Sequence, residues 1–387
     1  MKRIIPVILT CLVFAMLVFS GCTDSTESVN PAPTGAETGG GELTIIDGFD
    51  RTVTVPAPVE SVVCSGSGCV RYLVYLQGQD LDIGVDDIET KSRAIEGRPY
   101  YHVYGEQLKT LPLIGEFRGK DDPEKIIAIN PDVIFKTGST GTSYGTDAGE
   151  ANELQEKTGI PVVAFPYGSL RNDAEKADMY NGLRVMGEVI GKEDRAEEVI
   201  AYIDSTMADL EKRTADISAD EMKAVYIGGV SSAGAHGIIS TEPAYPPFLW
   251  VNADNVASGL GVAHADVAKE ALVGWDPEYI FVDLGTLMLE GEGALGELKT
   301  DPALQGLAAS ENNHVYGVLP YNFYNINYAT VLANAYFIGK VVYPEEFADI
   351  DPVEKADEIY SFFVGKPVFS EMDTQYGGLA YKELPLS

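Results

Sequence analysis

Small polar and aromatic residues that follow predicted strands are the best candidates for ligand contacts in this chain. The run Ser-Gly-Ser-Gly at residues 65–68 comes directly after an apolar strand, and a glycine-rich turn between a strand and a helix exposes backbone N–H groups. Tyrosines cluster where the last strand feeds a helix, and tyrosine combines a flat apolar surface with a polar tip. The predicted cleft residues are Ser65, Gly66, Ser67, Tyr100, Tyr101, Tyr144, His236, Trp250, Tyr321 and Tyr324.

A structural interpretation competes with the functional one at each of these positions. A tight turn that merely requires glycine explains residues 65–68 equally well. A tryptophan more often packs in a core than lines a pocket, which applies to Trp250. At least half of the aromatic and arginine side chains in residues 86–111 are expected to pack at the edge of a lobe. Tyr321 and Tyr324 are the two tyrosines that we expect to face the cleft.

Motifs of enzymes and of resident metal sites are missing from the sequence. It contains no G-x-S-x-G turn, no H-E-x-x-H helix and no phosphate-binding loop. The four histidines, His102, His236, His264 and His314, are dispersed and never stand at ligand spacing on one helix. The sequence therefore predicts no catalytic residue and no site for a bare metal ion, and it favours a binding protein over an enzyme.

Charge and the N-terminus predict where the protein works. The formal net charge of −32 argues against binding to nucleic acid or, through electrostatics, to anionic lipid. Lys2 and Arg3 precede an apolar stretch over residues 4–19 that is short for a membrane span, as in a secretion signal. The Phe-Ser-Gly-Cys that ends at Cys22 resembles the lipobox of bacterial and archaeal lipoproteins, which implies that Cys22 carries a lipid anchor. The alternative is an ordinary cleaved signal in which Cys22 is incidental.

Cys64 and Cys69 stand close together in a chain that is predicted to leave the cytoplasm. A disulfide between them is one interpretation. Two buried free thiols are the other, because the sequence does not define their geometry. A metal site is disfavoured, since no histidine or second cysteine pair stands nearby.

The rest of the chain alternates short apolar strands with helices and turns, which indicates an α/β fold. In its middle, apolar residues recur at helical spacing from Met179 to Leu210, with one break after Gly191. We expect two Rossmann-like lobes joined by a long helix, with the ligand cleft between them at the carboxyl ends of the strands. The predicted parts are a signal with lipobox (residues 1–22), a flexible tether (23–41), an N-terminal α/β lobe (42–171), a linker helix (172–192) and a C-terminal α/β lobe (193–387).

Two features of the sequence resemble a known family. The opening TIIDGFDRTVTVPAPVESVV is similar to that of the substrate-binding lipoproteins of iron-complex and cobalamin ABC importers. The stretches EKIIAINPDVIF, which starts at Glu124, and EALVGWDPEYIFVD, which starts at Glu270, are similar to a motif that occurs once per lobe in that family. The resemblance implies that Glu124 and Glu270 lie on outer surfaces and dock into basic pockets of a dimeric permease through charge-assisted hydrogen bonds.

The same resemblance implies a function and its partners. The protein would capture a chelated metal or corrinoid (ferric siderophore, haem or cobalamin) outside the cytoplasm and deliver it to an ABC permease dimer, whose separate subunits use ATP. The lipid would be its only membrane contact. The alternative ligand is an oxoanion such as molybdate or tungstate. Haem would favour a Tyr or His axial ligand, whereas an anion would favour the loop N–H groups and one of Arg71, Arg93, Arg98 or Arg118.

Two other classes of function compete with this interpretation. An extracellular hydrolase or redox enzyme could use a similar α/β scaffold, since fold does not determine function. Such an enzyme would need a nucleophile hydrogen-bonded to a base in the cleft. A surface adhesion module without a small ligand is the third class.

Overall fold

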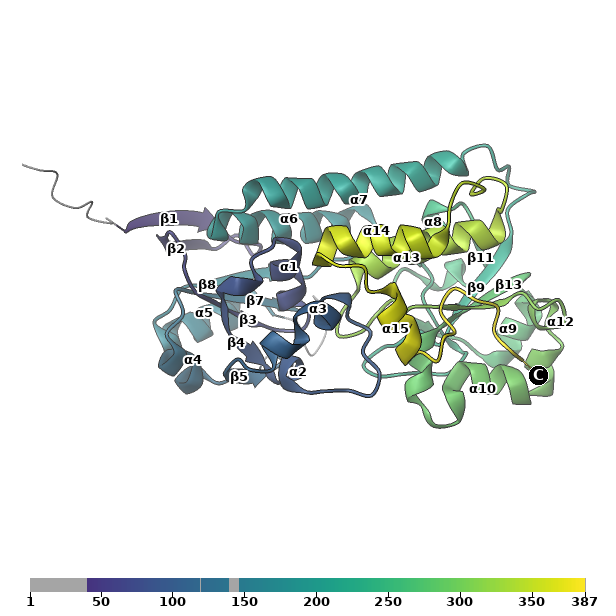
Figure 1. Ribbon diagram of the computed structural model, residues 1–387, viewed down its shortest axis with the longest axis horizontal. Helices are drawn as coiled ribbons and strands as arrows, with labels where there is room; N and C mark the ends of the chain where they lie inside the picture. The colour runs from purple at the N-terminus through teal and green to yellow at the C-terminus, as the bar shows by residue number, and fades with distance from the viewer. Residues whose placement is uncertain (1–39, 119, 139–145, 387) are drawn as a thin grey trace, which may run out of the picture. The chain divides into compact units, whose positions relative to one another are not determined.

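Strands and helices alternate along the chain in the computed structural model, which describes residues 40–118, 120–138 and 146–386. The fold is mixed α/β, as predicted; among the described residues, helices pack around a six-stranded and a four-stranded sheet, and two further strand pairs stand apart from these (Figure 1). Residues 40–387 form one compact unit. Among the described residues, no helix combines the length and the apolar character that a membrane span requires.

The first lobe contains a six-stranded sheet with the order β6-β5-β4-β3-β7-β8, parallel except for the β5–β6 pair. Before it, β1 (Gly41–Ile46) and β2 (Thr52–Ala57) form the hairpin that their alternating sequence predicts. The sheet strands are β3 (Val62–Ser65), β4 (Asp82–Asp86), β5 (Leu113–Glu116), β6 (Lys120–Asp121), β7 (Val133–Gly138) and β8 (Val162–Pro166). The helices are α1 (Cys69–Tyr75), α2 (Asp87–Thr90), α3 (Pro99–Leu108), α4 (Pro123–Ile129) and α5 (Ala148–Thr158).

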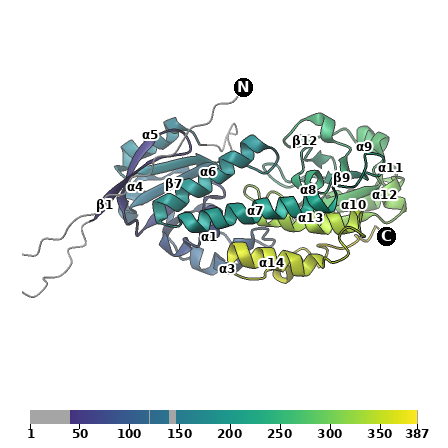
Figure 2. The same cartoon turned by 90° about the horizontal axis from the view of Figure 1, so that it is seen from above.

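Two long helices follow the first sheet, α6 (Asp173–Ile190) and α7 (Glu193–Arg213). The side chain of Asn172 accepts a hydrogen bond from the Glu175 backbone N–H and thereby caps the start of α6. Gly191, with φ of 64°, ends it in the left-handed conformation that glycine adopts without steric cost. The two helices pack on each other; α6 contacts β8 of the first lobe and α7 contacts α8 and α13 of the second (Figure 2).

The second lobe contains a four-stranded parallel sheet with the order β11-β9-β13-β14. Its strands are β9 (Ala224–Gly228), β11 (Asp254–Asn255), β13 (Tyr279–Asp283) and β14 (Val315–Val318), and β10 (Ser240–Thr241) pairs separately with β12 (Ala265–Asp266). Its helices are α8 (Pro246–Trp250), α9 (Lys269–Trp275), α10 (Gly293–Thr300), α11 (Pro302–Gln305), α12 (Ala308–Glu311), α13 (Tyr328–Val342), α14 (Pro352–Val364) and α15 (Phe369–Gln375).

One apolar core extends from the first lobe into the second. Helix α13 is buried along most of its length and packs against α7, α8 and α14. A smaller core lies between the first sheet and helices α4 and α5. The strands of both sheets that lead into polar loops are therefore held rigidly, which suits them to position the side chains of a site.

Candidate ligand-binding site

Arg71 links the two lobes through hydrogen bonds. It lies on α1, and its side chain is fully buried. The guanidinium donates to the Ile326 carbonyl at 2.9 Å, the Phe323 carbonyl at 3.1 Å and the Asn327 Oδ1 at 2.7 Å. It also donates to the hydroxyl of Tyr167. Arg71 thereby fixes residues 319–327, which we call the interlobe segment, between β14 and α13.

The interlobe segment adopts an unusual backbone conformation at its centre. Tyr324 and Asn325 have φ of 51° and 77°. This is a left-handed backbone conformation that residues other than glycine rarely adopt. Contacts with the first lobe hold it there: the Asn325 side chain donates to the Ser67 carbonyl at 3.1 Å, and the Tyr167 hydroxyl donates to the Ile326 carbonyl at 2.8 Å. The predicted glycine-rich turn and the predicted tyrosine cluster are thus neighbours.

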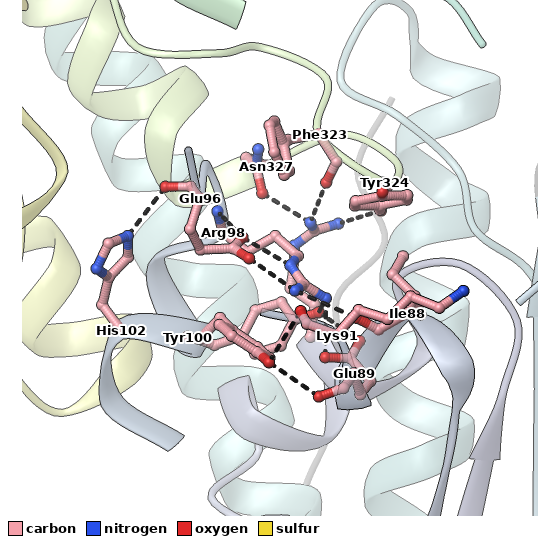
Figure 3. A network of polar contacts seen from close by, with 12 residues as sticks. Ile88, Glu89, Lys91, Glu96, Arg98, Tyr100, His102, Phe323, Tyr324 and Asn327 are labelled. Atoms are coloured by element: carbon pink, nitrogen blue, oxygen red, sulfur yellow. Dashed lines mark hydrogen bonds and ion pairs between the residues drawn. The ribbon is translucent and has the colours of Figure 1, made fainter. Parts of the chain in front are cut away.

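A buried ion-pair network lies beside this segment in the first lobe (Figure 3). Arg98 donates to Glu89 Oε2 at 2.8 Å and to Glu96 Oε1 at 2.7 Å. The hydroxyl of Tyr100 donates to Glu89 Oε1 at 2.7 Å, and that of Tyr101 donates to the Glu89 carbonyl at 3.0 Å. Burial raises the pKa of Glu89, and the Arg98 cation opposes that rise. Tyr100 and Tyr101 are thus buried, hydrogen-bonded side chains, and the Arg98 guanidinium contacts their rings and that of Tyr324.

Tyr324 is the part of the interlobe segment that combines an aromatic face with cations. The Arg93 guanidinium lies 4.4 Å from its ring centroid, and that of Arg98 lies 5.4 Å away. The ring of Phe117 meets it edge-on with 5.2 Å between centroids. Because Arg93 is exposed and Tyr324 is half-buried, this surface can accept a flat or anionic group.

In the second lobe, the carboxyl ends of three strands bring Ser231, Asp283 and Tyr321 together. Asp283 ends β13, and its carboxylate accepts hydrogen bonds from the backbone N–H of Tyr321 at 2.8 Å and of Gly285 at 2.9 Å. The Asn322 side chain donates to the Ser231 carbonyl at 2.9 Å. Burial raises the pKa of Asp283 to about 7. These contacts set the position of Tyr321 directly after β14.

The hydroxyls of Ser231 and Tyr321 are buried but form no hydrogen bond within the described residues. Their residues are only 8% and 2% exposed, respectively. Burial raises the pKa of Tyr321, with the charge of Glu242 adding to the rise and that of Arg171 opposing it. Arg171 itself donates to Glu242 Oε1 at 3.1 Å and to Glu175 Oε2 at 2.8 Å. The Tyr321 phenol, which has no hydrogen-bond partner among the described residues, is therefore influenced by the ion pair of Arg171 and Glu242.

Glu242 makes this site sensitive to pH. Burial raises its pKa from 4.5 to about 7, against the opposing charge of Arg171. A folded-state pKa above the unfolded value means that the Glu242 contribution to stability is complete below about pH 4.5 and is lost as pH rises through about 7, by at most about 3 kcal/mol. In urea unfolding, wild type should therefore lose stability relative to Glu242→Gln between these pH values. If the difference in unfolding free energy between the two proteins stays constant with pH, or changes in the opposite direction, the raised pKa of Glu242 is contradicted.

In the first lobe, the predicted turn Ser65-Gly66-Ser67 lies at the carboxyl end of β3. The Gly66 N–H donates to Asp86 Oδ2 at 2.6 Å, while Asp86 Oδ1 has no partner within the described residues. Gly66 has φ of 95°, and a Cβ there would lie 1.8 Å from the Thr137 carbonyl oxygen, so the position requires glycine. The Ser65 hydroxyl donates to Asp121, which also pairs with Lys136 at 2.6 Å. The Ser65 side chain therefore hydrogen-bonds within the first lobe, whereas the Ser67 carbonyl accepts a hydrogen bond from Asn325 of the second lobe.

The remaining predicted residues lie apart from these contacts. His236 Nε2 is 2.7 Å from the Ser232 carbonyl oxygen, and its ring centroid is 5.6 Å from that of His264. Trp250 on α8 is 3% exposed and belongs to the apolar core. Cys22 and Tyr144 lie outside the described residues. Glu124 and Glu270 are both exposed, in the first turns of α4 and α9.

Cys64 and Cys69 are both free and buried. Burial raises the pKa of each thiol. The Cys69 thiol lies 3.7 Å from the Phe135 carbonyl oxygen. The pair thus packs beneath the glycine-rich turn as two apolar thiols.

Two of the three residues Arg71, Arg171 and Glu242 carry a signal in the sequence for the contacts that they make. Arg71 is the only charged residue in the apolar run CVRYLVY, and such a residue is buried only with many polar partners. Arg171 directly precedes the cap of the linker helix, where the two lobes meet. Glu242 has no comparable signal, because it is one of 59 acidic residues.

Two α/β lobes that meet at the carboxyl ends of their sheets, with polar groups there that lack a partner among the described residues, are typical of a solute-binding protein. The chain belongs to the periplasmic binding protein family, whose sequence profile matches residues 87–321. It is thus a binding protein of the class that serves ABC importers.

Three known proteins illustrate the similarity. The molybdate-binding protein MolA of Haemophilus influenzae is 23% identical over 340 residues, which cover 82% of this chain and 90% of MolA. The structure of MolA bound to molybdate aligns with 84% of this chain and 98% of the MolA chain, with a TM-score of 0.65 and 18% identity. The substrate-binding lipoprotein YvrC of Bacillus subtilis is 24% identical over 186 residues, 48% of this chain and 51% of YvrC. The structure of the haem-binding protein HutB of Vibrio cholerae aligns with 73% of this chain and 99% of the HutB chain, with a TM-score of 0.53 and 17% identity.

Proposed function

We propose that this chain is the lipid-anchored binding protein of an ABC importer and that it captures a metal-containing solute between its lobes, in contact with Tyr321. The observation that carries this proposal is the pair of buried hydroxyls, of Ser231 and Tyr321, without hydrogen-bond partners in the described residues. Buried polar groups in folded proteins are almost always hydrogen-bonded. Both hydroxyls are therefore suited to bind a polar ligand, and the Arg171 cation acts on the Tyr321 hydroxyl.

A chelated metal is the first ligand class. A ferric siderophore, haem or cobalamin is large and partly flat, and the Tyr324 ring with Arg93 above it offers a matching aromatic and cationic surface. The fold similarity to HutB, which is named as a haem-binding protein, supports this class. Ser67, next to Tyr324 through Asn325, would supply a further polar contact.

An oxoanion such as molybdate or tungstate is the second class, and the buried donors fit it better. The buried hydroxyls of Ser231 and Tyr321, with the Arg171 charge acting on Tyr321, suit a small tetrahedral anion, because each oxygen of such an anion accepts hydrogen bonds. The similarity to MolA extends over most of both chains, and MolA is named for molybdate.

Titration of the purified protein distinguishes the two classes. Sodium molybdate, sodium sulfate, a ferric catecholate siderophore, haemin and cyanocobalamin would be compared by calorimetry and absorbance. A saturable, coloured 1:1 complex with one of the last three supports the chelate, whereas heat of binding with molybdate but not with sulfate supports the oxoanion. Failure to bind any of them, with turnover of a chromogenic ester by the ligand-free protein, would favour the enzyme interpretation and contradict the proposal.

Tyr321→Phe separates ligand binding from stability. The change removes a hydroxyl that has no partner in the described residues, so the free energy of unfolding should stay the same or rise slightly. Affinity for the bound solute should fall roughly tenfold or more, since one hydrogen bond to a charged ligand is lost. The matched control is Tyr226→Phe, whose hydroxyl donates to the Ile238 carbonyl at 2.8 Å and whose loss should lower stability without changing affinity. Unaltered affinity of Tyr321→Phe would contradict the placement of the ligand.

The partners in this proposal are a permease dimer and the cell membrane. Cys22 would carry the lipid, and YvrC is itself named a lipoprotein. Glu124 and Glu270 would dock on the permease, because each is exposed on the outer helix of its own lobe. Separate ATPase subunits would drive transport, so this chain would need no catalytic residue.

A further inference from the structure

The helices that carry Glu124 and Glu270 correspond residue by residue. Helices α4 and α9 are each seven residues long. Each is followed by a residue in the left-handed conformation, Asn130 with φ of 56° and Asp276 with φ of 44°. A proline follows in both cases, and one constant offset aligns the two units without a gap as far as the first residues of β7 and β13.

The exposure of the side chains repeats as well. Ile126 and Leu272, two positions after the glutamates, are both 0% exposed and anchor their helices to the cores. Ile127 and Val273, three positions after the glutamates, are 47% and 39% exposed. Residues three apart lie on the same side of a helix, one turn from each other. Each lobe therefore presents a carboxylate and an aliphatic side chain side by side on its outer helix.

We propose that these pairs, Glu124 with Ile127 and Glu270 with Val273, form two equivalent docking patches for a two-fold symmetric membrane protein. Each subunit of that partner would offer one basic group to the glutamate and one apolar contact to the aliphatic side chain. The inference rests on the proposed function, which assigns docking to the two glutamates alone. The inference adds an apolar part of the interface, which Ile127 and Val273 form beside the two glutamates.

Three physical arguments support an apolar component. A single exposed aliphatic side chain needs no explanation, but its recurrence at equivalent positions beside both glutamates does. An exposed ion pair contributes little because water screens it, and an apolar neighbour that excludes water strengthens the pair. Two equivalent patches on one chain match two copies of one surface, which is what a two-fold dimer provides.

The test replaces the aliphatic side chains while leaving the charges intact. Ile127→Ser with Val273→Ser is compared with the matched control Val353→Ser, an aliphatic residue that is 42% exposed on α14. Binding of the fluorescently labelled protein is measured on proteoliposomes that contain the permease and its ATPase subunits. The double variant should bind at least about tenfold more weakly, since two aliphatic contacts are lost. The control should bind as wild type does, and urea unfolding should show all variants folded.

Comparison with Glu124→Gln plus Glu270→Gln separates this inference from the proposed function. Weak docking by both double variants supports the inference. Normal docking by the serine variant with failure of the glutamine variant overturns the inference and leaves the proposed function intact. Normal docking by both overturns the docking assignment itself. As a second measurement, Ile127→Cys and Val273→Cys should each crosslink to the same permease polypeptide, whereas Val353→Cys should not; crosslinking of only one position would overturn the two-patch arrangement.

Discussion

The double variant Glu124→Gln, Glu270→Gln is expected to bind its solute with unchanged affinity and to support no uptake. Both side chains are exposed in the first turn of a helix, α4 in the first lobe and α9 in the second. Loss of a charge-assisted hydrogen bond in a desolvated interface costs about 2 kcal/mol or more, so two losses should weaken docking roughly a thousandfold. Uptake into cells and solute affinity of the purified protein are measured in parallel.

A charge-matched control keeps this result specific. Glu150 and Glu354 are likewise exposed acids in the first turns of helices α5 and α14. Their double change to Gln alters the net charge equally and should leave uptake intact. If the Glu124 and Glu270 variant still transports, docking involves other residues. If it loses solute affinity instead, the two glutamates belong to the ligand site and the import assignment needs revision.

The local features of this fold could be predicted from the sequence because short segments encode them. Asp122-Pro123 starts α4 through a side-chain cap and a proline at the first helical position. The alternating residues on either side of Asp47-Gly48 form the hairpin of β1 and β2. The parallel sheets of both lobes follow from the alternation of strands and helices, and the family comparison confirms the class of protein that the repeated glutamate motif implies.

The contacts of the site could not be predicted, because they join residues far apart in the chain. Arg71 binds the carbonyl of Phe323, which is 252 residues away. Glu242 and Arg171 pair across 71 residues, and no composition or periodicity indicates such a partner. Tyr324 illustrates the difficulty best: its backbone is left-handed, and the segment is held by contacts from the other lobe, which lie far away in the chain. That the predicted cleft residues contact the ligand stays a prediction, which ligand-binding measurements on their variants test.

Arg71→Met is expected to cause the largest loss of stability of any change discussed. Methionine fills a similar volume but donates no hydrogen bond, so the Phe323 carbonyl and the Asn327 amide oxygen lose their buried donor, while the Ile326 carbonyl keeps the Tyr167 hydroxyl. Each buried acceptor left unsatisfied costs about 1–3 kcal/mol, and removal of the buried cation offsets part of this, so the net loss should be about 3 kcal/mol or more. The free energy of unfolding, from urea titration, measures it.

Two further variants determine what Arg71 does. Arg71→Lys keeps the charge, but an ammonium group lacks the planar, forked donors with which a guanidinium reaches several carbonyls. It should therefore recover only part of the lost stability. Arg184→Met removes an arginine that is half exposed and pairs with Glu197, and it should cost less than about 1 kcal/mol. If Arg71→Met lowers stability and solute affinity together, the interlobe segment positions ligand groups as well as joining the lobes. If stability falls and affinity does not, Tyr324 is held for the fold alone, and the ligand contacts belong to Ser231 and Tyr321.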